Sequence, residues 1–470
     1  MKGICMKDNK KLSLLSLTML NITAIISLSS VAYMATIGLQ SVAFYLVAAV
    51  MFLIPSALVC AELSSMMTTN NGGVFTWVKE GLGKKAGMVA MWLEWFNNVI
   101  SFPGTISAIV ASVAYIGFES VLGSGVRLWM IMVIVFWIVT LFNFLPMKRV
   151  IILNVVGAIF GMILPGILLI SGAIYYLLNG QSQITYHGFQ DLIPVASLAT
   201  FALLVKSLSA YSGIQSVAFH MKNIQNPKKI IPLSMLIATI IIVSLTVLAT
   251  LSLMVIIPVD KVNVLNGLVQ GVSAVLATIG LSSMEPVVAL LIGLGMLAAL
   301  STWVLGPARG MQEAAEQQLF PEVMARKNKA GMPVNMLIIQ VVIGMVLSLS
   351  FLIMPTIYSA FALLVALTSQ FTVLMWVMIF ISAIRLRYKS PHQERVFHVG
   401  PRGKNWLLII VAVMALCACS VGFVSGLFPP AFSGITSIGW YVMLIAIADV
   451  IIILIPLLWM WLHHRRYAMS

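Results

Sequence analysis

The stretch LVKSLSAYSGIQSVAFHMKNIQNPKK, from Leu204 to Lys229, decides the fold of this chain. Its first half is apolar enough to enter a bilayer, yet it contains a charged residue, Lys206, and the polar cluster YSGIQ at 211–215. Gly213, inside that cluster, costs a helix about 1 kcal/mol relative to alanine. Serines flank it on the N-terminal side. The stretch therefore predicts a membrane helix that is interrupted near its middle.

The composition places the rest of the chain in the membrane class as well. Only 9% of the 470 residues are charged and 61% are hydrophobic, whereas soluble domains carry about 25% charged residues. A hydrocarbon core about 30 Å thick takes roughly 20 apolar residues per helical crossing. Apolar runs separated by charged or turn-rich gaps predict an all-α polytopic membrane protein with twelve transmembrane helices. The predicted spans are 12–33, 42–67, 86–116, 127–145, 151–178, 193–219, 232–257, 286–308, 333–353, 358–383, 406–427 and 438–462.

The basic residues are distributed unevenly along the chain. The net charge of +14 comes from 27 Lys and Arg against 13 Asp and Glu. With the N-terminus placed in the cytoplasm, all of these basic residues except Arg127, Lys261 and Lys206 fall in cytoplasmic segments. This is the positive-inside pattern of polytopic membrane proteins. It predicts a multi-pass protein with both termini in the cytoplasm and with a lipid bilayer, not nucleic acid, as its partner.

Motifs of soluble enzymes are missing from the sequence. It contains no phosphate-binding GxxxxGK[ST] loop, no HExxH pair and no CxxC pair. The six histidines fall in predicted loops or at a helix end, and the four cysteines fall in the N-terminal tail or inside spans. We therefore expect no enzyme activity, no catalytic residue, no cofactor, no metal site and no disulfide framework.

The spans divide into two halves of five, a pattern typical of transporters built from inverted repeats. Five spans cross the membrane an odd number of times, so a second copy must enter it with the opposite topology. The predicted divisions are a cytoplasmic tail at 1–11, a first five-helix repeat at 12–178, a second inverted repeat at 193–383, appended helices 11 and 12 at 406–462, and a short cytoplasmic tail at 463–470.

A break in the first helix of each half would leave backbone groups without intrahelical partners. The sixth span has Gly213 as its break signal, and the first span has a weaker one, SLSS at 27–30. Unwound backbone persists in a membrane only where it lines a cavity or binds something. A helix N-terminus suits a carboxylate, and freed carbonyl groups suit an ammonium. Two broken helices therefore predict a site for a zwitterion such as an amino acid.

Three blocks of the sequence resemble bacterial amino-acid permeases of the APC superfamily. They are GGVFTWVKEGLG at 72–83, AYSGIQS with KNIQNPKKIIP at 210–232, and WVLGPARGM with LFPEVMARKNKAGMPV at 303–334. The last block, with its GPxRGM and NKxGxPV patterns, is most similar to the glutamate/GABA antiporter type. The resemblance implies a LeuT-type 5+5 inverted repeat in a bacterial cell inner membrane, exchanging or co-transporting amino acids.

The resemblance also implies which residues bind the substrate. They belong to the two helix breaks and to the third and eighth spans: Ile26, Ser27, Leu28, Ser29, Ser30, Trp95, Asn97, Asn98, Ser209, Tyr211, Ser212, Gly213 and Trp303. One departure bears on coupling. The family commonly has Gly-x-Glu in the sixth helix, whereas here Gln215 stands in place of the glutamate and cannot titrate. A second departure is the absence of a folded C-terminal plug after span 12, where only 463–470 remain.

Charged residues inside the predicted spans are the remaining candidates, because a lone charge at membrane depth costs several kcal/mol. Lys206 could attract an anionic substrate group, gate the outer path, or pair structurally. Glu94 could pair with a substrate ammonium, carry the proton that Gln215 cannot, or make a structural hydrogen bond. Asp449 is expected to have a structural or oligomer-contact role, and Glu62 is expected to anchor a helix end or loop.

The sequence therefore predicts a secondary active transporter of amino acids, because its short loops leave no room for the soluble output domain of a sensor. Exchange of amino acids by alternating access is the favoured mode. Proton-coupled symport remains open, as does transport of polyamines or other organic cations. A homodimer is possible, and the identity of the amino acid is not determined by the sequence.

Overall fold

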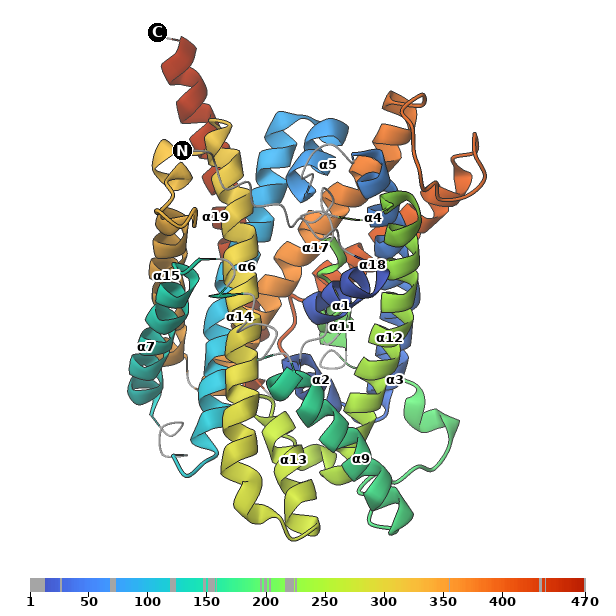
Figure 1. Ribbon diagram of the computed structural model, residues 1–470, viewed down its shortest axis with the longest axis vertical. Coiled ribbons are helices and arrows are strands. Elements are labelled where there is room, and N and C mark those ends of the chain that lie inside the picture. The colour runs from blue at the N-terminus through green and yellow to red at the C-terminus, as the bar shows by residue number, and fades with distance from the viewer. Residues whose placement is uncertain are drawn as a thin grey trace, which may run out of the picture.

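The computed structural model describes most of the chain. The described residues are 13–25, 28–67, 73–118, 124–146, 149–150, 157, 159–194, 197, 201–202, 204–215, 224, 226–354, 356–430, 433–435 and 437–468. The regular elements assigned within them are all helices. The expected all-α class is therefore confirmed, and the helices form one elongated bundle (Figure 1).

Ten helices of the described part are long and apolar enough to cross a membrane. They correspond to ten of the twelve predicted spans, and most of their ends lie within a few residues of the prediction. The described helix of the fifth span begins at Ile159, eight residues after the predicted start, and that of the eighth span continues to Glu316, eight residues beyond the predicted end. Three of the ten consist of consecutive segments. The ten helices are α3, η1 and α4 (Gln40–Met66), α6 (Lys84–Ala114), α7 (Gly125–Asn143), η3 and α9 (Ile159–Leu178), α12 (Pro227–Ile256), α14 (Glu285–Glu316), α15 and α16 (Val334–Ile353), α17 (Ile357–Lys389), α18 (Trp406–Ser425) and α19 (Ile438–Ala468).

The first and sixth predicted spans differ from the other ten. The first is described as two short helices, α1 (Leu14–Ile25) and α2 (Leu28–Ala35), and residues 26–27 between them lie outside the described residues. In the sixth, α11 (Leu204–Ser209) ends within the membrane sequence and the chain turns through 210–213. Gly213 has φ +123°, a conformation that side chains other than glycine rarely adopt. The short helices lie in the middle of the bundle in Figure 1.

Two of the predicted loops contain helices. The segment read as the loop after the second span forms α5 (Val74–Leu82), which packs against α6 and α17. The long gap after the seventh span contains α13 (Gly267–Thr278), which packs against α9 and lies at the opposite end of the bundle (Figure 1). Both are too short to be recognised as membrane spans, because a crossing takes roughly 20 residues.

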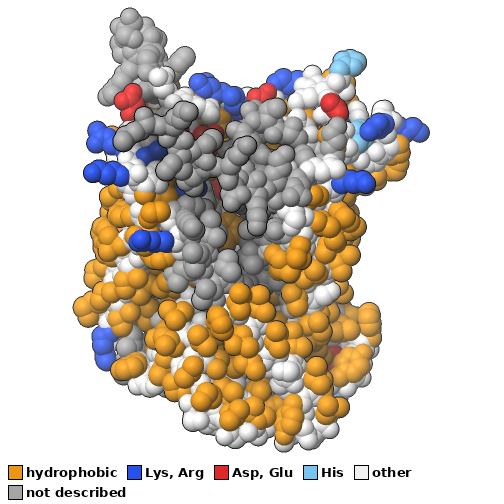
Figure 2. Space-filling view, in the orientation of Figure 1, with side chains coloured by type: hydrophobic (Ala, Val, Ile, Leu, Met, Phe, Trp, Pro, Cys, Tyr) orange, Lys and Arg blue, Asp and Glu red, His pale blue; other side chains and the backbone are white. Residues whose placement is uncertain are grey.

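The surface separates into an apolar body and a charged end. Figure 2 shows hydrophobic side chains over the middle and lower part of this face, and most Lys and Arg at the upper end, where Figure 1 places α5 and the end of α19. A contiguous apolar girdle of this kind suits contact with lipid. The positive-inside rule predicts that the upper end faces the cytoplasm.

Small residues let two helices of the bundle approach closely. An ideal Cβ on Gly295 of α14 would lie 2.2 Å from the Cα of Gly161 in η3 (Ile159–Ile163), and a Cβ on Gly161 would lie 2.1 Å from the Cα of Gly295. Membrane helices associate through such small-residue contacts, because lipid offers no hydrophobic driving force between them. Gly295 also lies in the wall of the cavity described below, so this contact positions one side of the site.

We expect Gly295→Ala to destabilise the bundle, because the new methyl group meets backbone atoms that cannot move aside. Overpacking of this kind costs about 1–3 kcal/mol. The measurement is the apparent melting temperature of the purified protein in detergent, which should fall by several degrees. Gly306→Ala on the same helix is the matched control, since a Cβ there meets nothing within 4 Å. Equal melting temperatures for the two variants would contradict the close contact.

A buried ion-pair network ties α4 (Ile54–Met66) to α17 at the charged end. Arg387 donates from Nη2 to Glu62 Oε2 at 2.6 Å and from Nη2 to the Val399 carbonyl at 3.0 Å. The Val399 amide donates to Glu62 Oε2 at 2.8 Å, and Arg395 Nε lies 3.4 Å from Glu62 Oε1. These contacts fit the predicted role of Glu62 as an anchor for a helix end or loop. Glu62 holds the segment that follows α17 through the Val399 amide and Arg395.

Replacing Glu62 should be far more damaging than replacing an exposed glutamate. Glu62→Gln leaves the buried Arg387 guanidinium without its counter-charge, and breaking a buried pair in this way costs about 3–5 kcal/mol. We expect a large loss of folded protein in size-exclusion chromatography and a lower melting temperature. Glu322→Gln, at an exposed position of η8 (Glu322–Ala325), should change neither. A stable Glu62→Gln protein would show that the network is not required for folding.

Candidate functional site

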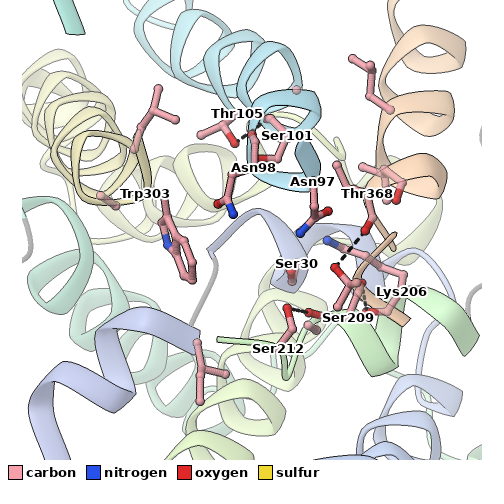
Figure 3. Close-up of a pocket in the computed structure, with 18 of the residues that line it drawn as sticks. Ser30, Asn97, Asn98, Ser101, Thr105, Lys206, Ser209, Ser212, Trp303 and Thr368 are labelled. Atoms are coloured by element: carbon pink, nitrogen blue, oxygen red, sulfur yellow. Dashed lines mark hydrogen bonds between the residues drawn. The ribbon is translucent and has the colours of Figure 1, made fainter. Parts of the chain in front are cut away.

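A cavity of about 240 Å³ lies at the centre of the bundle, between α2, α6, α14, α17 and the segment 204–215. Figure 3 shows Trp303 on one side of it and Lys206, Ser209 and Thr368 on the other, with the two asparagines between them. The described lining consists of Ile25, Ser30, Glu94, Asn97, Asn98, Ser101, Gly104, Thr105, Lys206, Ser209, Ala210, Ser212, Gln215, Gly295, Met296, Ala299, Leu300, Trp303, Phe361, Leu364, Val365, Thr368 and Thr372.

One polar stripe of α6 forms the largest part of the wall. Glu94, Asn97, Asn98, Ser101 and Thr105 recur at helical spacing, so they share one face of the helix. Several of them satisfy their donors within the helix. Asn98 Nδ2 donates to the Glu94 carbonyl at 2.8 Å, and Ser101 Oγ donates to the Asn98 carbonyl at 2.7 Å. Their oxygen lone pairs are thus available to a donor in the cavity.

Two oxygens on this stripe have no hydrogen-bond partner among the described residues. They are Glu94 Oε2 and Asn97 Oδ1, both inaccessible to solvent. A buried polar atom without a partner costs about 1–3 kcal/mol. Two such acceptors on one wall of a cavity therefore indicate a site that receives hydrogen-bond donors from a bound molecule.

The interrupted segment 204–215 forms the facing wall, and its hydrogen bonds hold the turn. Ser212 Oγ donates to the Ser209 carbonyl at 2.8 Å, and Ser209 Oγ lies 2.9 Å from Ser369 Oγ of α17. After the turn, the Gly213 amide donates to Gln215 Oε1 at 2.8 Å. The side chain of Gln215 also lies near the Glu94 carboxyl group. The contact joins the two walls at one end of the cavity.

Lys206 supplies the positive charge of the described lining. Its ammonium lies 5.8 Å from the ring centroid of Tyr33 on α2, a cation–π distance. No carboxylate of the described residues lies within 4.0 Å of it, since no such ion pair occurs there. In Figure 3 its side chain reaches into the same space as Asn97 and Ser209. Lys206 and Glu94 thus place one base and one acid in the same cavity, with no ion pair between them.

The structure brings together most of the residues predicted for the site. Eight of the expected substrate-binding or coupling residues on α6, α14 and the sixth span line the cavity together with Ser30, as follows: Glu94, Asn97, Asn98, Lys206, Ser209, Ser212, Gln215 and Trp303. Ile26 and Ser27 lie outside the described residues, and the side chains of Leu28 and Ser29 are likewise outside them.

Three predicted residues do not belong to the described lining. Trp95 is buried and donates from Nε1 to Gln340 Oε1 of α15 at 3.3 Å. Tyr211 is buried with its hydroxyl 3.3 Å from Thr246 Oγ1 of α12, and Gly213 supplies the turn. Asp449 on α19, for which a structural or oligomer-contact role was predicted, is buried and lies outside the lining as well. These positions give Trp95 and Tyr211 packing contacts in place of cavity contacts.

The sequence prediction missed several lining residues that a helical-spacing argument could have found. Ser101 and Thr105 follow Glu94 and Asn98 by steps of three and four residues. Thr368 and Thr372 repeat the same spacing after Phe361 and Val365 on α17. Hydroxyl residues in an apolar span look like ordinary helix packing until a second helix is known to face them.

The arrangement suits a small molecule that carries both charges. The cavity is smaller than the roughly 300–1,000 Å³ typical of drug-sized ligands. It offers one acid, one base, amides, hydroxyls and an indole, and no cluster of three or more His, Cys, Asp or Glu that could hold a metal ion occurs in the described part of the chain.

The chain is similar to known membrane transport proteins over most of its length. A family model described as "Amino acid permease" matches residues 12–454. An uncharacterised transporter of Legionella pneumophila is 30% identical over 90% of this chain and 91% of its own length. A glutamate/gamma-aminobutyrate antiporter of Lactococcus lactis is 28% identical over 98% of this chain and 92% of its own length.

One solved structure has a similar fold. The crystal structure of MhsT in complex with L-phenylalanine matches with a TM-score of 0.58 and 14% sequence identity, over 89% of this chain and 99% of that chain. At this identity the likeness concerns the fold, and it extends over nearly the whole helical bundle.

Proposed function

This chain belongs to the amino acid permease family, and we propose that it exchanges amino acids across the bacterial inner membrane by alternating access. The observation that carries the proposal is the central cavity, which lies beside α1, α2 and the turn after α11 and which holds an acidic and a basic group without an ion pair between them. The protein is a membrane transporter and not an enzyme.

In the proposed binding mode the interrupted helices hold the ends of the amino acid that all substrates share. Amide groups at the start of α2 would bind the carboxylate, because a helix N-terminus carries partial positive charge. Carbonyl groups at the end of α11 would accept from the ammonium, together with Asn97 Oδ1. Trp303 would pack against the side chain of the substrate and, with Asn98, shape its selectivity.

The remaining features of the proposal follow the sequence prediction. The ten long helices and the two interrupted spans would make twelve crossings, arranged as two inverted repeats with two appended helices and with both termini in the cytoplasm. The likeness to MhsT supports this arrangement.

Exchange is favoured over the alternatives by two observations. The antiporter of Lactococcus lactis aligns with nearly the whole chain. Polyamines and other organic cations carry several positive charges, whereas the described lining offers a single carboxylate, Glu94, beside a fixed cation, Lys206. Proton-coupled symport is the alternative that the test below distinguishes.

The proposal is tested with purified protein in proteoliposomes. Uptake of each labelled amino acid is measured into vesicles that contain the same amino acid, a different one, or none. We expect uptake only where internal amino acid is present, because an exchanger returns loaded. Uptake into vesicles without amino acid, driven by an imposed pH gradient, would show symport, and no uptake of any amino acid would overturn the function.

The charge of Lys206 should set the preference among substrates. An interaction with a charged group contributes about 1.5–3 kcal/mol, so we expect Lys206→Met to raise the apparent KM for aspartate and glutamate by about tenfold or more. The same variant should discriminate less against lysine and arginine. Lys206→Arg, which keeps the charge, is the matched control. An equal change in KM for acidic, neutral and basic amino acids would show that Lys206 acts on gating or stability instead.

A further inference from the structure

We propose that the Glu94–Gln215 pair is the coupling site of this transporter, at which the Glu94 carboxylate exchanges a proton for the ammonium group of the substrate. This rests on the proposed function, because it assigns the ion that accompanies amino-acid binding in the same cavity. The exchange is balanced: the neutral carboxyl releases one proton to water, and the carboxylate that remains forms an ion pair with the incoming ammonium.

The geometry of the pair fixes which atoms meet. Gln215 Oε1 accepts the Gly213 amide, so the Nε2 group of Gln215 is the donor available to the Glu94 carboxyl. Glu94 Oε2 has no hydrogen-bond partner among the described residues. Glu94 is 3% exposed and Gln215 is 5% exposed, and both line the cavity. The free oxygen is the natural place for a proton or an ammonium.

The surroundings of Glu94 supply no fixed counter-charge. No Lys, Arg or His nitrogen of the described residues lies within 4.0 Å of its carboxyl group. Two titratable groups lie around Glu94. The Cys60 thiol on α4 interacts electrostatically with its carboxyl group, and Lys206 lies across the cavity. From the packed helices α14 and α17 the lining contributes Trp303, Thr372 and other uncharged side chains, and Asp449 of α19 lies outside the lining.

An unpaired carboxylate at membrane depth is costly, and either a proton or an ammonium removes that cost. The two therefore compete for one oxygen. Lowering the pH should raise the apparent KM for substrate, and raising the pH should lower it, by up to tenfold per pH unit, the limit for one competing proton. Exchange of two amino acids by this step moves no net proton.

The test uses substitutions that exchange the carboxyl and amide side chains between positions 94 and 215. Three variants are compared with the parent: Glu94→Gln, Gln215→Glu, and the double variant Glu94→Gln/Gln215→Glu. The amino acid with the fastest exchange in the proteoliposome panel is the probe. The readouts are the pH dependence of its apparent KM and the proton released on its binding to detergent-purified protein, measured by calorimetry in buffers of different ionisation enthalpy.

We expect about one proton released per substrate bound by the parent, about none for Glu94→Gln, and recovery of proton release in the double variant. Asp449→Asn, which removes a buried carboxyl outside the cavity, should behave as the parent. Melting temperatures in detergent separate a folding defect from loss of coupling, and the double variant supplies a folded comparison if Glu94→Gln is unstable.

The outcomes separate this inference from the function on which it rests. If the parent exchanges no amino acid, the proposed function fails. If Glu94→Gln exchanges amino acids and keeps the proton release and the pH dependence of the parent, the exchanger stands and Glu94 is a structural residue. A double variant that is folded and active but releases no proton would show that the pair is not interchangeable, and would overturn the coupling site.

Discussion

The structure depends on one constraint: inside a membrane, a polar group must find a partner within the protein, because lipid offers none. Most of the chain meets it with long helices whose backbone bonds are internal. The exception is the centre of the bundle, where α11 stops at Ser209 and the chain turns through Gly213. There the amides of 210–213 are bonded within the segment, that of Gly213 by the Gln215 side chain, and the polar stripes of α6 and α17 line the cavity beside it.

The same constraint divides the charged residues into two kinds. Glu62 and Arg387 satisfy each other and the backbone near Val399, and they hold the end of the bundle at which most Lys and Arg gather in Figure 2. Glu94 and Lys206 have no such partners among the described residues and lie in the cavity. A paired buried charge fixes a structure, whereas an unpaired one is stabilised when a ligand of opposite charge arrives. Glu62 and Arg387 therefore stabilise the fold, whereas Glu94 and Lys206 are available to bind a substrate.

Tight packing gives the cavity its shape. The contact of Gly161 with Gly295 brings α14 close enough for Trp303 on the same helix to reach the site. On α6, residues one position apart have separate tasks: Trp95 turns outward to Gln340 of α15 while Glu94 faces the cavity. Adjacent positions on a helix differ by about 100° in direction, so a stripe of binding residues and a stripe of packing residues can share one helix.

The sequence alone determined the class of the protein, ten of its membrane helices and the position of the break at Gly213, because hydropathy, charge distribution and glycine act locally along the chain. It also singled out Glu94, Lys206 and Gln215, since a charge or amide in an apolar span is costly wherever the chain folds. It missed Ser101, Thr105, Thr368 and Thr372, and it placed Trp95 and Tyr211 at the site. Only the tertiary structure decided these, because which face of a helix meets a cavity depends on the helices packed against it. The contact between Glu94 and Gln215, 121 residues apart by their numbering, likewise exists only once α6 and the sixth span are side by side.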